Sequence, residues 1–159
     1  MLRLSKLTDY AVVVLLRLSD SDPGEPVQTS PGIAAATGVP EPTVAKVLKA
    51  LAASHLVSSQ RGARGGYRLM RPLDEIAVAD VIAAIDGPIA LTACVDGSAA
   101  PCCEVQGLCA VKGRWDLVND TIRRALESIT LAEMRDAGVP PAFRIERPTV
   151  MPAHLPLAE

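Results

Sequence analysis

All four cysteines of the 159-residue chain lie between Cys94 and Cys109, a stretch called here the cysteine segment (residues 94–109). It reads CVDGSAAPCCEVQGLC, so glycine, proline and polar residues separate the thiols. A free cysteine in a protein core behaves as a small apolar side chain, and four of them in one polar loop are not a core pattern. Their grouping raises the question of what these neighbouring sulfurs bind.

Three chemistries compete for the thiols. They can be buried or paired in disulfides, but a chain of this length folds without such links. They can hold zinc, although zinc sites usually bring cysteine pairs two to four residues apart, whereas Cys102 and Cys103 are adjacent. They can hold an iron–sulfur cluster, because the five residues between Cys103 and Cys109, and the longer gap after Cys94, let the chain wrap a larger object. The spacing favours the cluster and leaves the other two chemistries open.

The composition predicts a protein built from packed helices. Apolar residues make up 49% of the chain and aromatic residues only 3%, so Ala, Val, Leu and Ile must form the core. The apolar run AVVVLL (residues 11–16) is too short to span a bilayer, and no small-residue cleavage site follows it. We therefore expect a cytoplasmic protein without membrane contact, in a compartment where thiols stay reduced.

Charge is distributed unevenly along the chain. Residues 1–72 hold nine Lys and Arg against five Asp and Glu, whereas the remaining residues hold seven against thirteen. A basic N-terminal part on an acidic chain indicates that this part meets a polyanion.

The N-terminal part carries the pattern of a helix-turn-helix. A first helix is predicted from about Thr8, whose hydroxyl would cap it, to Ser19. A short second helix would follow Ser30 as its N-cap and end at Gly38, and a third would run over residues 41–54. The apolar positions of the third helix are spaced three and four residues apart, which leaves an outer face for contact with DNA. That face carries Thr43, Lys46 and Lys49.

A basic hairpin is predicted directly after these helices. Residues 56–60 and 66–70 alternate as two short strands around a tip that carries Arg61 and Arg64. A solvated surface hairpin would have the same pattern, but after a helix-turn-helix it indicates the wing of a winged helix. We expect Ser30 to grip phosphate, Thr43 and Lys46 to approach base edges or phosphates, and Arg61 and Arg64 to enter a minor groove. Tyr67, in the second strand, completes the predicted DNA-binding set.

The rest of the chain is expected to carry sensing and assembly. Asp74 would cap a helix that ends near Ile85, and a loop over residues 89–113 would hold the cysteines. A helix over residues 114–129 carries an apolar stripe that suits either packing within one subunit or a seam between two subunits. TLAE (residues 130–133) predicts a capping box for a last short helix. The predicted organisation is a winged helix-turn-helix domain over 1–72, a linker helix, cysteine loop and dimerisation helix over 73–138, and a proline-rich, disordered tail over 139–159.

The chain resembles the bacterial winged-helix iron–sulfur regulators over residues 1–137. The resemblance rests on MLRLSKLTDYAVVVL, on the wing sequence HLVSSQRGARGGYRL, and on CCEVQGLC followed by the tryptophan-bearing helix and ITLAEM. The opening is most similar to the branch that controls the sulfur-mobilisation (SUF) operon for cluster assembly. The resemblance implies a homodimer that binds a double-stranded operator, represses cluster-assembly genes according to cluster status, and is not an enzyme. A nitric-oxide- or redox-responsive repressor of the same family is an alternative, as is a zinc-stabilised DNA-binding protein without sensing.

The resemblance also implies a ligand set for a [2Fe–2S] or [4Fe–4S] cluster. Cys94, Cys103 and Cys109 match the three cysteine ligands of the family, and Cys102 is an extra candidate thiol of the metal site, expected to substitute for a ligand or to act as a resolving thiol. The general assembly regulators place a histidine three residues after the last cysteine, where this chain has Lys112. The nitric-oxide-responsive relatives use an aspartate of the first helix instead, and Asp9 stands at that position. Asp9 also suits the first turn of a helix for purely structural reasons, because the helix dipole favours a carboxylate there.

Overall fold

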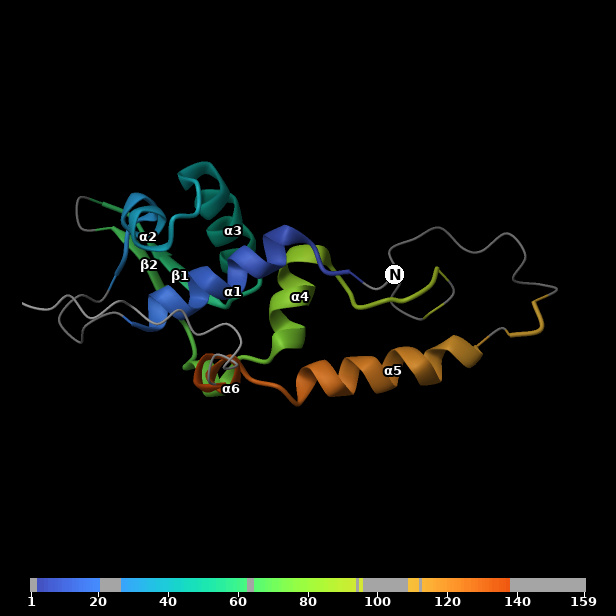
Figure 1. Cartoon of the computed structure of the whole chain (residues 1–159). Coiled ribbons are helices and arrows are strands. Elements are labelled where there is room, and N and C mark those ends of the chain that lie inside the picture. Colours follow the sequence, from blue (N-terminus) through green and yellow to red (C-terminus); the bar gives the residue numbers. More distant parts are fainter. Residues whose placement is uncertain are drawn as a thin grey trace, which may run out of the picture.

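The computed structural model describes residues 3–20, 27–62, 65–93, 95, 109–111 and 113–137. The described part is mainly helical and holds one two-stranded antiparallel hairpin, which confirms the predicted fold class (Figure 1). Its elements, in chain order, are α1 (Lys6–Ser19), α2 (Ser30–Thr37), α3 (Glu41–Ala53), β1 (Val57–Gln60), β2 (Gly66–Leu69), the 3₁₀ helix η1 (Leu73–Glu75), α4 (Val78–Asp86), α5 (Arg114–Glu127) and α6 (Leu131–Asp136).

The hydrophobic core surrounds α1. Ala11, Val14 and Leu15 are fully buried, and α1 contacts α2, α3, α4, α6 and β2. The core is aliphatic, as the composition predicts. Its fully buried members outside α1 are Ile33, Val44, Val47, Leu48, Leu51, Ile76, Val81 and Leu131. Ile76, at the end of η1, Val81 of α4 and Leu131 of α6 come after the predicted domain boundary at residue 72. Residues on both sides of this boundary therefore share one core.

Helices α2 and α3 and the hairpin form a winged helix. Gly38 ends α2 in the left-handed conformation, with φ of 73°, and α3 starts three residues later. In the hairpin, Val57 pairs with Leu69 and Gln60 with Gly66. The predicted helix-turn-helix and wing are confirmed, with strands shorter by one residue than expected at their outer ends.

Two predicted helix caps are wrong by a few residues. The N-cap of α1 is Ser5, whose Oγ accepts the N–H of Thr8 at 3.2 Å, so α1 starts before Thr8. The N-cap of α2 is Thr29, whose Oγ1 accepts the N–H of Gly32 at 3.2 Å, so Ser30 is the first helical residue. In both places a different hydroxyl-bearing residue has the extended backbone conformation that an N-cap requires, and it caps the helix instead of the predicted residue.

The predicted cap at Asp74 is also wrong, and α5 ends earlier than predicted. Asp74 lies in η1, and α4 begins only at Val78. The Val78 N–H donates to the Ile129 carbonyl and the Leu131 N–H to the Ile76 carbonyl, both at 2.9 Å. This strand-like pairing delays the start of α4 and ends α5 at Glu127, before the predicted residue 129. The capping box of α6 is confirmed, with the Thr130 N–H donating to Glu133 Oε2 at 2.8 Å.

Helix α5 lies beside α4 and extends away from the bundle (Figure 1). Asn119 is its one buried residue, and its apolar side chains are largely exposed. Leu117 is 75% exposed, and Trp115 and Val118 are each more than 40% exposed. Helix α5 therefore buries little of its apolar surface against the rest of its own chain.

A stability prediction follows from the turn between α3 and β1. His55 has φ of 57°, and the Leu56 N–H donates to the Leu51 carbonyl at 3.0 Å, which is the pattern of a left-handed helix C-terminus. His55→Gly should raise the free energy of unfolding by about 0.5 kcal/mol, because glycine adopts this conformation without steric cost. His55→Val should lower it by more than about 1 kcal/mol, measured by urea denaturation.

Ser54→Gly is the matched control, because Ser54 has φ of −95° and gains nothing from glycine. It should lower the free energy of unfolding. A stabilising effect of the same size in both glycine variants would contradict the assignment of strain to His55.

Candidate functional site

A hollow lies between the N-terminus of α2 and the wing. It is lined by three of the predicted DNA-binding residues, Ser30, Arg61 and Tyr67. The hollow therefore lies at the junction of the helix-turn-helix and the hairpin. The other lining residues are Thr29, Ser59, Gln60, Gly62, Gly65 and Gly66. The sequence analysis did not predict Thr29, Ser59 and Gln60 as site residues. Ser59 and Gln60 are exposed polar residues at the end of the short strand β1, which is a weak signal of a binding surface.

Backbone pairing fixes the start of α2 against the wing. The Tyr67 N–H donates to the Gln28 carbonyl at 2.8 Å, and the Gln28 N–H donates back to the Tyr67 carbonyl at 2.9 Å. A Cβ on Gly66 would lie 2.7 Å from the Gln28 carbonyl oxygen, so this close approach requires glycine. Gly66 therefore lets the wing lie close against the residues that lead into α2.

The hollow suits an anionic oxygen. The N-terminus of α2 gives it the positive end of a helix dipole, although Pro31 has no N–H and Thr29 already accepts the Gly32 N–H; the exposed Arg61 side chain stands at its edge. The Ser30 Oγ is buried and has no hydrogen-bond partner within the described part of the chain. A buried hydroxyl without a partner costs free energy, which an incoming phosphate oxygen would recover.

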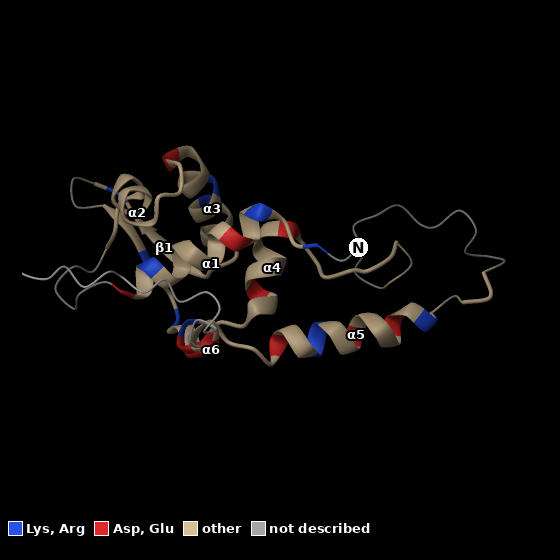
Figure 2. Ribbon diagram, in the orientation of Figure 1, with Lys and Arg blue, Asp and Glu red and all other residues tan. Residues whose placement is uncertain are grey.

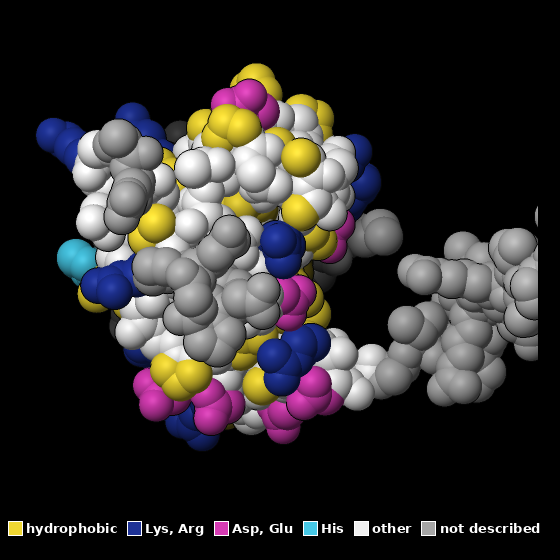
Figure 3. Space-filling view, turned by 90° about the vertical axis from the view of Figure 1, so that its left-hand side faces the viewer, with side chains coloured by type: hydrophobic (Ala, Val, Ile, Leu, Met, Phe, Trp, Pro, Cys, Tyr) yellow, Lys and Arg dark blue, Asp and Glu magenta, His cyan; other side chains and the backbone are white. Residues whose placement is uncertain are grey.

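The other predicted DNA-binding residues lie on α3 or outside the described residues. Lys46 is exposed and Thr43 half-buried on the outer face of α3, a helix whose ribbon carries basic positions in Figure 2. Neither lines the hollow. Arg64 lies outside the described residues. In the space-filling view of this end of the molecule, Lys and Arg side chains project at the upper left edge, whereas acidic side chains gather, mixed with basic ones, at the lower edge (Figure 3).

The predicted cluster ligands are only partly described. Cys109 is half-buried, and its thiol is not in a disulfide. Cys94, Cys102, Cys103 and Lys112 lie outside the described residues. Asp9 is exposed in the first turn of α1, and its carboxylate makes no hydrogen bond within the described part of the chain.

Asp9 and Cys109 fit a cluster by the chemistry of their donor atoms. A free thiol and an unengaged carboxylate are available as ligands to iron. Asp9 lines a hollow with Val78 and Met134, and Cys109 is not among its lining residues. No three potential ligands lie together among the described residues, so the complete ligand set stays a prediction.

The chain that enters the cysteine segment is tied to α1. At the end of α4, Asp86 Oδ2 accepts the Thr8 hydroxyl at 2.7 Å and the Ser5 N–H at 3.3 Å. Desolvation raises the pKa of the Asp86 carboxyl, but hydrogen bonds from Ser5 and Thr8 outweigh it and hold this pKa below its ordinary value. The same two residues begin the helix that carries Asp9.

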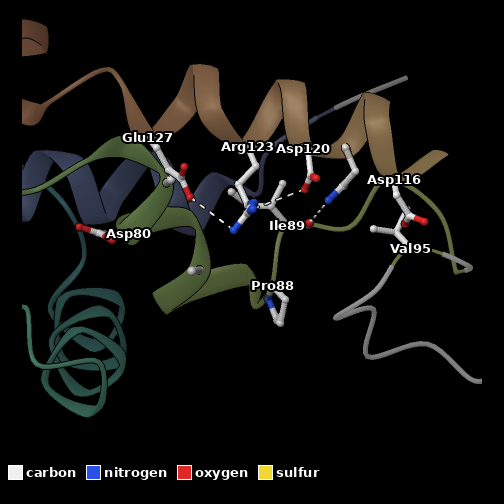
Figure 4. Close-up of a pocket in the computed structure, with 11 residues that line it drawn as sticks. Asp80, Pro88, Ile89, Val95, Asp116, Asp120, Arg123 and Glu127 are labelled. Carbon is white, nitrogen blue, oxygen red and sulfur yellow. Dashed lines mark hydrogen bonds and ion pairs between the residues drawn. The ribbon is translucent and has the colours of Figure 1, made fainter. Parts of the chain in front are cut away.

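A groove of about 600 Å³ separates α4 from α5 (Figure 4). On its α5 wall, Arg123 lies 3.4 Å from Asp120 and 3.6 Å from Glu127, and each of these side chains is about half exposed. Such exposed pairs contribute little stability, about 0.5 kcal/mol each. The groove floor holds the buried Asn119, which hydrogen bonds to the backbone of Ile89 and Leu91.

These features define a winged-helix DNA-binding protein with a cysteine-bearing insertion before its last long helix. Comparison with known proteins gives the family. The model of Rrf2, described as an iron-dependent transcriptional regulator, matches residues 4–137. The chain belongs to the Rrf2 family of DNA-binding transcriptional regulators. No described helix is long and apolar enough to cross a membrane.

Individual relatives cover most of the chain. The Rv1287 protein of Mycobacterium tuberculosis is 34% identical over 140 residues, which are 87% of this chain and 84% of that protein. The HTH-type transcriptional regulator IscR of Escherichia coli is 30% identical over 133 residues, 84% of this chain and 80% of its own. Among solved structures, T. potens IscR has a TM-score of 0.58 at 32% identity and covers 86% of this chain and 89% of its own. CymR, the global cysteine regulator of B. subtilis, has a TM-score of 0.64 at 26% identity, with 87% of this chain and 100% of its own covered.

The Asp86 contacts predict an acid-sensitive part of the stability. Because the folded pKa of Asp86 is lowered, its contribution is fully present above the ordinary aspartate pKa of about 4 and is lost as the pH falls through the lower folded value. Because Asp86 is exposed and solvent weakens its interactions, Asp86→Ala should reduce the free energy of unfolding by only about 0.5 kcal/mol near neutral pH. The difference from wild type should disappear in acid. Asp74→Ala, which removes an exposed aspartate of η1, should show neither effect.

The hollow predicts a specific role for Arg61 in DNA binding. Arg61→Ala should weaken binding to a mixed-sequence DNA duplex and make the slope of log K against log salt shallower by about 1, because one phosphate contact is lost. Arg135→Ala changes the net charge equally but removes an arginine of α6 that is paired with Asp136 at 3.0 Å. It should leave the slope unchanged. Equal slopes in wild type and Arg61→Ala, by fluorescence anisotropy, would refute the contact.

Proposed function

We propose that this protein is a transcriptional repressor whose operator binding depends on an iron–sulfur cluster held by the cysteine segment, and that it controls cluster-assembly genes of the SUF type. The observation that carries the proposal is the gathering of all four cysteines in one segment, inserted between α4 and α5 of a regulator fold. The family description as iron-dependent regulators and the similarity to two IscR proteins support it.

Cys94, Cys103 and Cys109 would hold the cluster, with Asp9 as the fourth ligand. The free Cys109 thiol and the exposed, unengaged Asp9 carboxylate support these two assignments. Lys112 stands where the general assembly regulators have histidine, and a protonated amine is a poor ligand for iron. When bound, such a cluster supplies iron centres that respond to iron supply, oxidants or nitric oxide. The iron content per chain distinguishes a [2Fe–2S] from a [4Fe–4S] cluster.

A second copy of the chain would cover the apolar face of α5. Trp115 and Val118, three residues apart on one side of α5, are each more than 40% exposed in the single chain, although neighbouring large apolar side chains are normally covered. Pairing through α5 would place two winged helices on successive faces of a near-palindromic operator. In each head, Ser30 and Arg61, with Arg64 and Tyr67, would hold the DNA backbone and the adjacent groove, while Thr43 and Lys46 approach base edges.

The position of Asp9 favours a second candidate function within the same family. The nitric-oxide-responsive relatives take a ligand from the first helix, and Asp9 lies in the first turn of α1. On this reading the repressor responds to nitric oxide or redox stress in the cytoplasm. Both functions require iron, whereas a zinc-stabilised DNA-binding protein does not.

Metal analysis of protein purified without oxygen tests the proposal. We expect brown protein with visible absorbance, bound iron and acid-labile sulfide. Cys109→Ala should lose iron and sulfide, while Cys102→Ala, which removes the extra thiol, should keep them. Colourless wild type without iron after reconstitution, or stoichiometric zinc in its place, would refute the cluster. Titrating the brown protein with nitric oxide, and separately with an iron chelator, then distinguishes the two regulatory functions by their effects on DNA binding.

A further inference from the structure

Asn119 is a buried polar residue on a helix whose other residues are exposed or half-buried. It is 4% exposed, and it is the one residue of α5 that is buried. Leucine or alanine would be the usual side chain at a helix position that faces a neighbouring helix. An amide in this place costs free energy unless each of its polar atoms has a partner.

Both ends of the Asn119 amide have partners. Its Nδ2 donates to the Ile89 carbonyl at 3.0 Å, a bond drawn in Figure 4, and its Oδ1 accepts the Leu91 N–H at 3.1 Å. A neighbouring β-strand would offer the same donor and acceptor to two residues of an extended chain. Asparagine combines one donor and one acceptor at this length, whereas aspartate lacks the donor and leucine lacks both.

These two hydrogen bonds join the chain on either side of the cysteine segment. Ile89 and Leu91 lie just before it and α5 just after it, and the bonds span 30 and 28 positions of the sequence. All four cysteines fall inside this span. The path into the segment is tied on its other side to α1, through Asp86 and Thr8.

We propose that Asn119 is a positioning residue that couples the state of the cysteine segment to the placement of α5. The inference rests on the proposed function. Because the amide grips two backbone groups in a fixed register, residues 89–91 and α5 cannot shift separately while both bonds hold. If the path of residues 89–91 differs between cluster-loaded and cluster-free protein, α5 must shift with them. Because α5 is the proposed contact with the partner subunit, this shift would change the placement of the partner's DNA-binding domain. Asn119 touches no thiol among the described residues, so its removal should spare the cluster.

The test compares DNA affinity with and without the cluster. The probe is a duplex selected by the wild-type protein from a random pool, and the readout is the ratio of Kd values for cluster-loaded and cluster-free protein. Asn119→Leu, of similar size, should keep iron and sulfide at the wild-type level but bring this ratio at least about fivefold closer to one, at the lower end of typical couplings. Asp120→Asn, a neighbour on the wall of the same groove, is the control and should retain the wild-type ratio.

A second measurement reports on Asn119 without any cluster. In cluster-free protein, hydrogen exchange at the Leu91 amide should be slow in wild type and faster in Asn119→Leu. Asn119→Asp keeps the acceptor for the Leu91 N–H, but a carboxylate oxygen that repels the Ile89 carbonyl replaces the donor, so the variant should keep Leu91 protected and still bring the ratio closer to one. This nearly isosteric variant also serves if Asn119→Leu fails to fold.

The outcomes separate this inference from the proposed function. Wild type without iron, or with a ratio of one, overturns the proposed function and the coupling with it. Wild type with iron and a ratio different from one, together with Asn119 variants that keep this ratio, overturns the coupling alone. Loss of iron in both Asn119 variants would also overturn it, because Asn119 would then hold the ligands in place instead of transmitting their state.

Discussion

Burial of α1 on nearly all its sides is the constraint on which the rest of the structure depends. Ala11, Val14 and Leu15 have no exposed surface, and the helices that cover them come from both halves of the chain. The core contains almost no aromatic side chains, so its stability comes from many close aliphatic contacts, each of which is sensitive to small changes in volume. Helix α1 therefore holds a fixed place against all that surrounds it.

The two ends of α1 connect the two functional parts of the molecule. At its C-terminal end, the Arg17 carbonyl accepts the Gln28 side chain at 3.1 Å, and Gln28 pairs with the wing at Tyr67. At its N-terminal end, Thr8 holds Asp86, after which the chain enters the cysteine segment. One rigid helix thus joins the DNA-binding surface to the start of the proposed sensor. The coupling proposed for Asn119 acts on the other side of the same segment, toward α5.

Periodic and capping patterns predicted the regular elements well, and their exact ends less well. Val44, Val47, Leu48 and Leu51 mark one face of α3, and all four are buried. Ser5 and Thr8, and likewise Thr29 and Ser30, offer two hydroxyls for each cap, and only the backbone path decides which one serves. The start of α4 was predicted at the wrong residue because residues 76–78 pair with residues 129–131. No local sequence pattern predicts this long-range contact.

The sequence by itself determined the kind of protein, since the winged-helix pattern, the basic N-terminal part and the grouped cysteines are local features of composition and spacing. Only the tertiary structure decided how the chain before and after the cysteine segment is held. Thr8 bonds to Asp86 across 78 positions, and Asn119 bonds to Leu91 across 28. An asparagine in a polar helix and a threonine in a first turn have ordinary roles when read locally. Their partners come close only when the core packs, because burial of aliphatic surface, and not the polar residues themselves, brings these distant segments together.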